Sequence, residues 1–230
     1  MFKAVIFDMD GVIADSEPIH VQAEKDLFRP YGVELSDEEL QRFMGFGIEP
    51  MLQKLVKTYN VPVQSDALYA RHKVVLLERM KNGLQPVPGA TDLVLSLHAG
   101  NVPLGLATSC FREMALLVVR KFGIEACFKV VVTVEDIAKS KPDPEIFLKA
   151  AERLGFAPGE CLAIEDSANG VRAAKAAGMA CIGFRNEHCG LQDIGGADAV
   201  VDDLRKIDDA MLRSFGFMPD TGASTKISNG

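Results

Sequence analysis

Clustered positive charge and long apolar runs are both missing from this sequence. The formal net charge is −7 at pH 7, and no run of Lys and Arg exceeds a few residues. This argues against nucleic acid or an anionic membrane as the main partner, because both require clustered positive charge. No apolar run approaches the roughly 20 residues that a membrane-spanning helix needs. We therefore expect no nucleic-acid or membrane partner, whereas a small anionic ligand needs only a few local cations.

Cysteines are few and lack the spacing of a metal or redox motif. There are five, an odd number, and no two of them form a CxxC pair. Such free thiols are typical of a reducing compartment. Acidic residues follow the first strand-like segment so closely that the N-terminal stretch does not fit a signal peptide. We therefore expect a cytoplasmic protein with five free thiols, Cys110, Cys127, Cys161, Cys181 and Cys189.

What the sequence does contain is an alternation of strand-like and helix-like segments. Its 230 residues, 48% hydrophobic and 25% charged, are typical of a globular protein and allow a core with a smaller second domain. Short β-rich apolar runs alternate with helical stretches, which indicates an α/β fold with a doubly wound, Rossmann-like parallel sheet. The predicted strands are 4–7, 104–107, 130–133, 161–164 and 180–183, and the predicted helices are 89–99, 112–122, 144–154 and 168–177.

One long segment interrupts this alternation. Nearly one hundred residues separate the first two predicted strands, far more than a single crossover helix requires. Residues 15–85 are predicted to be almost entirely helical, and the Pro-rich return at 85–89 suits a stiff linker. We therefore predict an α/β core at 1–14 and 86–215 and an inserted all-helical domain at 15–85. The Gly-, Ser- and Thr-rich end at 216–230 is expected to be a disordered tail.

Two carboxylates follow the first predicted strand. Asp8 and Asp10 are two residues apart, so their side chains face the same side of an extended chain. They lie at the carboxyl end of a parallel strand, where open α/β sheets bind their ligands. Gly11 permits a sharp turn directly after them. Taken alone, the pair is as compatible with loop carboxylates that cap a helix as it is with a functional site.

Polar residues also follow three later predicted strands. They are Thr108 with Ser109, then Lys141, then Glu165 with Asp166. Each has an ordinary explanation, namely a helix N-cap, a solvated lysine, or acidic residues that favour a helix N-terminus. Because all of them lie at strand ends and are chemically complementary, together they predict one site at the carboxyl edge of the sheet.

Four short motifs carry a family resemblance. The set Asp8-x-Asp10-Gly11, Thr108-Ser109, Lys141-Pro142 and Glu165-Asp166-Ser167 resembles the motifs of the haloacid dehalogenase superfamily. The resemblance covers nearly the whole chain up to about Arg205, and the helical insertion resembles that family's cap domain. Asp15-Ser16-Glu17-Pro18 and Lys141-Pro142-Asp143-Pro144 point further, to the branch with small-sugar phosphatases and β-phosphoglucomutase. The motifs are specific for the superfamily and much less so for the substrate.

The resemblance implies a Mg²⁺-dependent phosphoryl transfer. Asp8 would attack phosphorus and form an aspartyl-phosphate, which splits one difficult displacement into two easier ones. Asp10 would protonate the leaving oxygen and then deprotonate the incoming water or alcohol. An Asp8 oxygen, the Asp10 backbone carbonyl and the Asp166 carboxylate would bind Mg²⁺, with Glu165 in a supporting role.

The resemblance also implies a set of residues that bind the substrate. Lys141 and the Thr108 and Ser109 donors would hold the phosphoryl oxygens, which carry the transition-state charge. Gly11 lies in the first motif and is a further phosphate-binding candidate. His20 and Glu17 are candidates from the insertion, although both have an ordinary explanation as residues of a solvated helix face.

The phosphoryl acceptor distinguishes two enzyme classes. A phosphatase admits water, whereas a phosphomutase must bind a second, distal phosphate, and in that family an Arg in the cap loop does so. By alignment Ile48 stands at that position here, and Arg42 lies nearby at a different one. We therefore predict a phosphatase for a small phosphorylated metabolite, a sugar phosphate, with a phosphomutase of the β-phosphoglucomutase type as the alternative.

Other classes fit the motifs less well. A true dehalogenase would keep Asp8 but would have no use for Asp10 or Mg²⁺. A receiver-type signalling domain has no helical insertion, and its phospho-acceptor follows its acidic pair. A non-catalytic phosphate-binding protein is disfavoured because every motif position is intact. A monomer or weak homodimer is expected.

Overall fold

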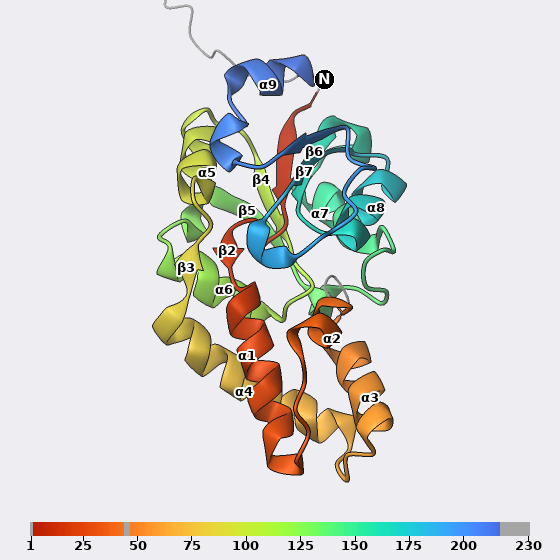
Figure 1. The fold of residues 1–230 in the computed structure, drawn as a ribbon. Coiled ribbons are helices and arrows are strands. Elements are labelled where there is room, and N and C mark those ends of the chain that lie inside the picture. The colour runs from red at the N-terminus through yellow and green to blue at the C-terminus, as the bar shows by residue number, and fades with distance from the viewer. Residues whose placement is uncertain (1, 44–46, 217–230) are drawn as a thin grey trace, which may run out of the picture.

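A six-stranded parallel sheet forms the centre of the computed structural model, which describes residues 2–43 and 47–216 (Figure 1). The strand order is β5-β4-β1-β6-β7-β8, and each neighbouring pair is parallel. The first strand of the chain lies inside the sheet and later strands extend it in both directions, as the predicted doubly wound fold requires. The strands are β1 Ala4–Phe7, β4 Leu104–Ala107, β5 Phe128–Val132, β6 Cys161–Glu165, β7 Ala180–Phe184 and β8 Ala199–Val201.

Helices cover both faces of the sheet. Val5 and Phe7 of β1 share a hydrophobic cluster with α5 and α6, whereas Ala4 and Ile6 share a second cluster with α7 and α8. Alternate residues of a strand point to opposite faces, so a strand between two helical layers must be apolar throughout. The helices of this α/β core are α5 Ala90–Ala99, α6 Arg112–Lys121, α7 Glu145–Leu154, α8 Ala168–Ala176 and α9 Asp209–Ser214.

Between the first two strands of the large sheet lies an insertion, whose described residues form four further helices. They are α1 Glu17–Phe28, α2 Asp37–Gln41, α3 Ile48–Tyr59 and α4 Ser65–Gly83. The chain enters through β2, Ala14–Asp15, and returns through β3, Gln85–Pro86. These two short strands pair antiparallel, with Ala14 opposite Pro86, so both connections to the core lie side by side. We call Glu17–Gly83 the helical insertion.

The strand and helix boundaries differ in places from the predicted ones. Strand β5 begins two residues earlier than predicted and ends at Val132, because Thr133 instead caps a 3₁₀ turn through its hydrogen bonds with Asp136. The short strands β2, β3 and β8 were not predicted. Most of the predicted tail, 217–230, lies outside the described residues.

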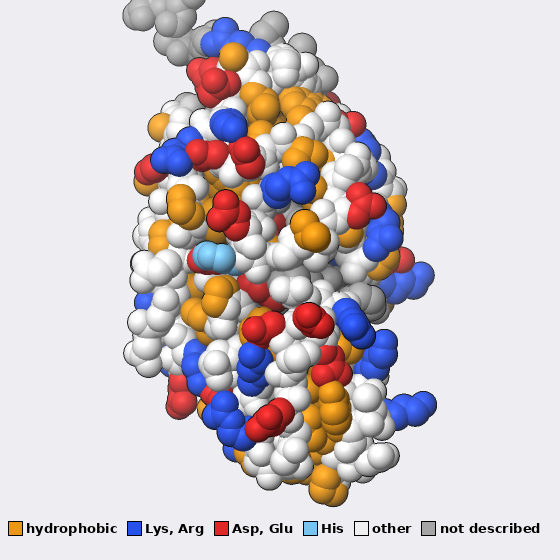
Figure 2. All heavy atoms as spheres, in the orientation of Figure 1, with side chains coloured by type: hydrophobic (Ala, Val, Ile, Leu, Met, Phe, Trp, Pro, Cys, Tyr) orange, Lys and Arg blue, Asp and Glu red, His pale blue; other side chains and the backbone are white. Residues whose placement is uncertain are grey.

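Charge is mixed on the face of the molecule that Figure 2 draws. On the face drawn in Figure 2, Lys and Arg side chains are interspersed with acidic ones, and acidic side chains gather where the core meets the helical insertion. Among the described residues, no helix is both long enough and apolar enough to cross a membrane.

Candidate active site

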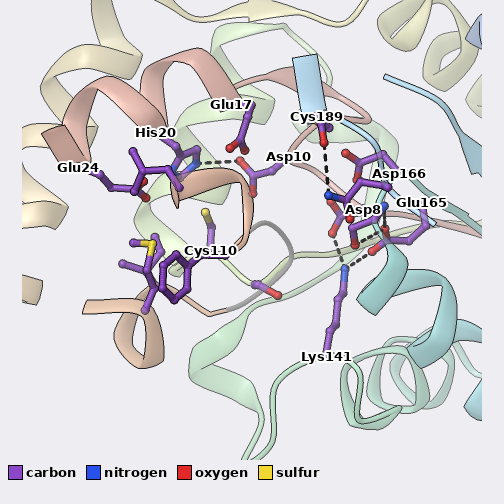
Figure 3. Close-up of a pocket in the computed structure, with 17 residues that line it drawn as sticks. Asp8, Asp10, Glu17, His20, Glu24, Cys110, Lys141, Glu165, Asp166 and Cys189 are labelled. Carbon is purple, nitrogen blue, oxygen red and sulfur yellow. Dashed lines mark hydrogen bonds and ion pairs between the residues drawn. The ribbon is translucent and has the colours of Figure 1, made fainter. Parts of the chain in front are cut away.

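Asp8 directly follows β1 and is buried beside Lys141 and Glu165 (Figure 3). Lys141 Nζ donates hydrogen bonds to Asp8 Oδ1 at 2.5 Å and to Glu165 Oε1 at 2.6 Å. It also donates to the backbone carbonyl of Ala107 at 3.3 Å. The Lys141 side chain is only 3% exposed, so its ordinary explanation as a solvated lysine is wrong. One buried cation therefore links the carboxyl ends of β1, β4 and β6.

Buried carboxylates outnumber the buried cation at this edge of the sheet. Burial raises the pKa of Asp8 and the pKa of Asp166, and Lys141 opposes this only in part. Burial also opposes the charge of Lys141, but Asp8 and Glu165 outweigh it and raise the pKa of the lysine. The ammonium group therefore stays protonated, and the site keeps an excess of carboxylate groups over cations.

Glycines allow the backbone to approach two of these carboxylates closely. Glu165 Oε2 accepts hydrogen bonds from the Ser167 amide at 2.9 Å and from its hydroxyl at 3.0 Å. A Cβ atom on Gly170, in α8, would lie 1.7 Å from Glu165 Oε1. Gly11 has a φ of +77°, and a Cβ there would lie 2.0 Å from Asp166 Oδ2. A larger residue at either position would displace an acidic side chain of the site.

The Asp10 side chain turns toward the helical insertion (Figure 3). Ser16 Oγ donates to Asp10 Oδ1 at 2.6 Å, and His20 Nε2 lies 3.3 Å from the same oxygen. Thr108 Oγ1 donates to Asp10 Oδ2 at 3.3 Å. Burial opposes both charges, yet the pairing with His20 lowers the pKa of Asp10 to about 2, and raises the pKa of His20 to about 9. An ion pair therefore joins the core to the insertion.

One pocket between the core and the helical insertion collects most of the predicted site residues. Thr108 and Gly11 do not line it, since the Thr108 hydroxyl is turned to Asp10 and Gly11 lies against Asp166. Ile48 lines the pocket, whereas Arg42 is exposed and lies outside it. Eight predicted residues line the pocket: Asp8, Asp10, Glu17, His20, Ser109, Lys141, Glu165 and Asp166.

Several lining residues were not singled out from the sequence. Glu24 is one turn of α1 beyond His20, and this i, i+4 spacing could have identified it, because such residues share a helix face. No comparable signal marks Cys110 or Cys189, which reach the pocket only through the tertiary fold. The remaining lining residues that were missed are Leu40, Phe43, Met51 and Gln192, whereas Ser167 belongs to the fourth motif.

The donor set of the core suits a hard divalent cation. Mg²⁺ prefers carboxylate, carbonyl and water oxygens, and Asp8 and Asp166 are buried carboxylates whose charge is not fully balanced by Lys141. The Asp10 side chain is occupied by Ser16 and His20, which leaves its backbone carbonyl as the donor that the family resemblance implies. The residues present therefore fit Mg²⁺.

A family profile matches most of the chain. The profile described as haloacid dehalogenase-like hydrolase aligns with residues 5–184. That range contains all four motifs and the whole helical insertion.

Two of the relatives are named for different enzyme classes. A probable pseudouridine-5'-phosphatase of Drosophila melanogaster is 36% identical over 183 residues, which is 76% of this chain and 78% of the relative. A β-phosphoglucomutase of Bacillus subtilis is 32% identical over 208 residues, covering 86% and 88%. Among solved structures, a variant of CbbY from Rhodobacter sphaeroides in complex with xylulose-(1,5)bisphosphate matches with a TM-score of 0.82 and 26% identity, covering 89% of this chain and 95% of that one.

Proposed function

The chain belongs to the haloacid dehalogenase-like hydrolase family, and we propose that it is a Mg²⁺-dependent phosphatase that hydrolyses a small sugar phosphate through an aspartyl-phosphate. The observation that carries this proposal is the buried contact of Asp8 with Lys141 and Glu165. A carboxylate fixed at a strand end can attack phosphorus, and a protonated lysine beside it can hold the negative charge of the transferring group. The phosphatase names of relatives support the same assignment.

Asp10 is the proposed acid and base of the reaction. It lies on the insertion side of the nucleophile, where the leaving group of a bound substrate would project into the pocket. Ser16 and His20 hold its carboxylate, so a proton shared within this group can pass to the leaving oxygen and be regained from water. Ser109 lines the pocket and is the proposed donor to a phosphoryl oxygen.

Asp8, Asp166 and the Asp10 carbonyl are the proposed Mg²⁺ ligands. When bound, Mg²⁺ would neutralise the charge that otherwise keeps an anionic carboxylate from a phosphate dianion. Both oxygens of Glu165 are engaged within the chain, one with Lys141 and one with Ser167. Its supporting role is therefore to fix the lysine beside Asp8.

The pocket wall contributed by the insertion favours an uncharged, hydroxyl-rich leaving group. Glu17 and Glu24 are acidic, and Ile48 and Met51 are apolar. Carboxylates bind hydroxyl groups and repel a second phosphate. Relatives named for a nucleoside phosphate and for phosphorylated carbohydrates support a sugar phosphate as the substrate.

A phosphomutase is the second candidate, favoured by the 32% identity to a β-phosphoglucomutase. A mutase must hold a distal phosphate as well as the transferred one. Among the lining residues that the structure describes, Lys141 is the single Lys or Arg, and it is already bound to Asp8. Ile48 lines the pocket at the position where the resemblance expects an arginine. This arrangement favours the phosphatase.

The helical insertion is the proposed cap over the active site. Its two connections lie side by side at β2 and β3, and it supplies His20 and Glu24 to the pocket wall. Closure of such a domain excludes water and presents substrate-reading residues. A monomer or weak homodimer in the cytoplasm remains the expectation for the whole protein.

Phosphate release from a panel of phosphorylated sugars, polyols and nucleotides tests the proposed function. We expect Mg²⁺-dependent release that Asp8→Asn abolishes, because the amide cannot attack phosphorus. Asp92→Asn, an exposed position on α5, is the matched control and should keep full activity. Absence of release from every compound would contradict the phosphatase, and interconversion of sugar phosphates by the same protein would establish the mutase instead.

A further inference from the structure

Three potential metal ligands converge between α1 and α4, beside the pocket. One ligand atom each from His20, Glu24 and His72 lies within 4.8 Å of the others. His20 and Glu24 are four residues apart on α1 and share one face of that helix, while His72 comes from the neighbouring helix α4. Figure 3 shows Glu24 on the side of His20 that faces away from Asp8.

His72 has an environment that packing alone does not explain. The residue is fully buried, and neither of its ring nitrogens has a hydrogen-bond partner among the residues that the structure describes. An imidazole that is buried without partners costs on the order of 1–3 kcal/mol, so nearly all buried polar groups in proteins have a partner. The ring is stacked on that of His20, with 6.4 Å between centroids, which places it against the other histidine of the cluster.

Glu24 adds a second buried polar group, and its charge interacts with that of His20. The residue is 6% exposed. A buried carboxylate next to two imidazoles is costly unless a cation balances it. His20 supplies one positive charge, but His20 is already paired with Asp10.

We propose that His20, Glu24 and His72 bind a divalent transition-metal ion of the Zn²⁺ class. Two imidazoles and one carboxylate are a typical Zn²⁺ ligand set, and a fourth position is commonly left to water. Glu24 and His20 line the pocket whereas His72 lies behind them, so the fourth position faces the pocket. The nitrogen ligands distinguish this site from the all-oxygen Mg²⁺ site proposed in the core.

The neighbourhood of His20 is already arranged as in known metal sites. Its Nε2 lies 3.3 Å from Asp10 Oδ1, so Nδ1 is the nitrogen that would bind the ion, and the imidazolium would release its Nδ1 proton on binding. A metal-binding histidine usually donates its other ring N–H to a carboxylate, which fixes the orientation of the ring. Helices α1 and α4 are also held together by the ion pair of Arg79 with Asp26. The site therefore requires little rearrangement of the two helices.

Zn²⁺ titration of the untagged, Mg²⁺-free protein against a chromophoric chelator tests the proposal. We expect one ion per chain with micromolar or tighter affinity. Glu24→Gln, which keeps the size of the side chain, should weaken binding by at least roughly 10-fold, as should His72→Asn. Two controls should keep wild-type affinity: Asp8→Asn, which removes a ligand of the proposed Mg²⁺ site, and His98→Asn, which removes an exposed histidine elsewhere.

NMR of the imidazole rings in the wild-type protein tests the same site, so the result does not depend on whether a variant folds. Zn²⁺ should shift the ring nitrogens of His20 and His72 and leave those of His98 and His188 unchanged. Affinity that survives in Glu24→Gln but is lost in Asp8→Asn would overturn the proposal, because the ion would then occupy the core site. Absence of a bound ion would overturn it as well. Neither result depends on phosphatase activity, so the proposed function stands or falls separately.

Discussion

At the scale of single residues, the active site depends on how one lysine is shared between two carboxylates. Lys141 Nζ lies 2.5 Å from Asp8 and 2.6 Å from Glu165, all three being buried. The contact with Glu165 holds the ammonium group in place, and the contact with Asp8 brings it to the nucleophile. Glu165 is therefore a positioning residue for the proposed reaction.

Replacing Glu165 with Gln should reduce activity without unfolding the protein. The amide has nearly the same volume but loses the charge that holds Lys141, and we expect kcat to fall roughly 10- to 100-fold, the usual effect of losing an orienting partner. Steady-state kinetics and thermal unfolding, with Glu187→Gln as a matched control, would measure this. If Tm falls so far that the loss of folded protein in the assay accounts for the lost activity, Glu165 is only structural.

The sequence predicts the core half of the site better than the half in the insertion. Asp8, Lys141 and Asp166 follow separate strands, and parallel strands bring their carboxyl ends to one edge whatever the details of packing. Glu24 and His72 lie on helices α1 and α4, which are separated by residues 29–64, and no local sequence pattern indicates that these two helices pack together. Their meeting depends on how α1 and α4 pack, which periodicity does not reveal.

At the scale of elements, Asp136 connects three segments of the core. Its carboxylate accepts hydrogen bonds from Arg112 of α6 at 2.5 Å and from Arg153 of α7 at 2.8 Å. It also accepts the backbone and hydroxyl hydrogen bonds of Thr133, which follows β5. Burial opposes this charge, but the hydrogen bonds from Arg153 and Thr133, with the charge of Arg112, lower the pKa of Asp136 to about 2.

The Asp136 linkage should make part of the stability depend on pH. A carboxyl group whose pKa is lower in the folded state stabilises the protein above its unfolded pKa of about 3.9, and this contribution is lost as pH falls toward 2. Asp136→Asn should therefore cost about 1–2 kcal/mol at pH 7, since the site is partly exposed and screened. Denaturant unfolding at pH 7 and pH 3 would test this, because the difference between variant and wild type should shrink at pH 3. An equal difference at both values would contradict it.

Elements with a local apolar pattern were predicted more reliably than elements that depend on the tertiary fold. Strands β1 and β4 have the predicted bounds, because each is an apolar run flanked by polar residues. Strands β2 and β3 have two residues each and exist because the two connections of the insertion meet, so no local pattern marks them. Strand β8 has an exposed central residue, Val200, and ends the sheet, where burial imposes little pattern on the sequence.

At the scale of the whole molecule, the insertion has a hydrophobic core of its own. Leu52 of α3 packs there with Leu27 and Phe28 of α1, while Leu106 belongs to the core of the large sheet. Helix α4 contributes to both: Leu68 lies in the insertion cluster and Met80 lies in the cluster of the sheet. The two parts are therefore joined by α4, by the β2–β3 pair and by the Asp10–His20 ion pair, and damage to one hydrophobic core need not spread to the other.

Truncation of Leu52 should loosen the insertion while the sheet keeps its stability. Leu52 is fully buried, and Leu→Ala changes at such sites cost about 2–5 kcal/mol. Hydrogen exchange should quicken in α1, α3 and the first half of α4, but not in β1, β4 or β6, because the latter elements belong to another cluster. Leu106→Ala is the matched variant in the sheet and should quicken exchange in those strands. Equal acceleration throughout the chain in Leu52→Ala would show instead that α4 makes the two cores unfold as one unit.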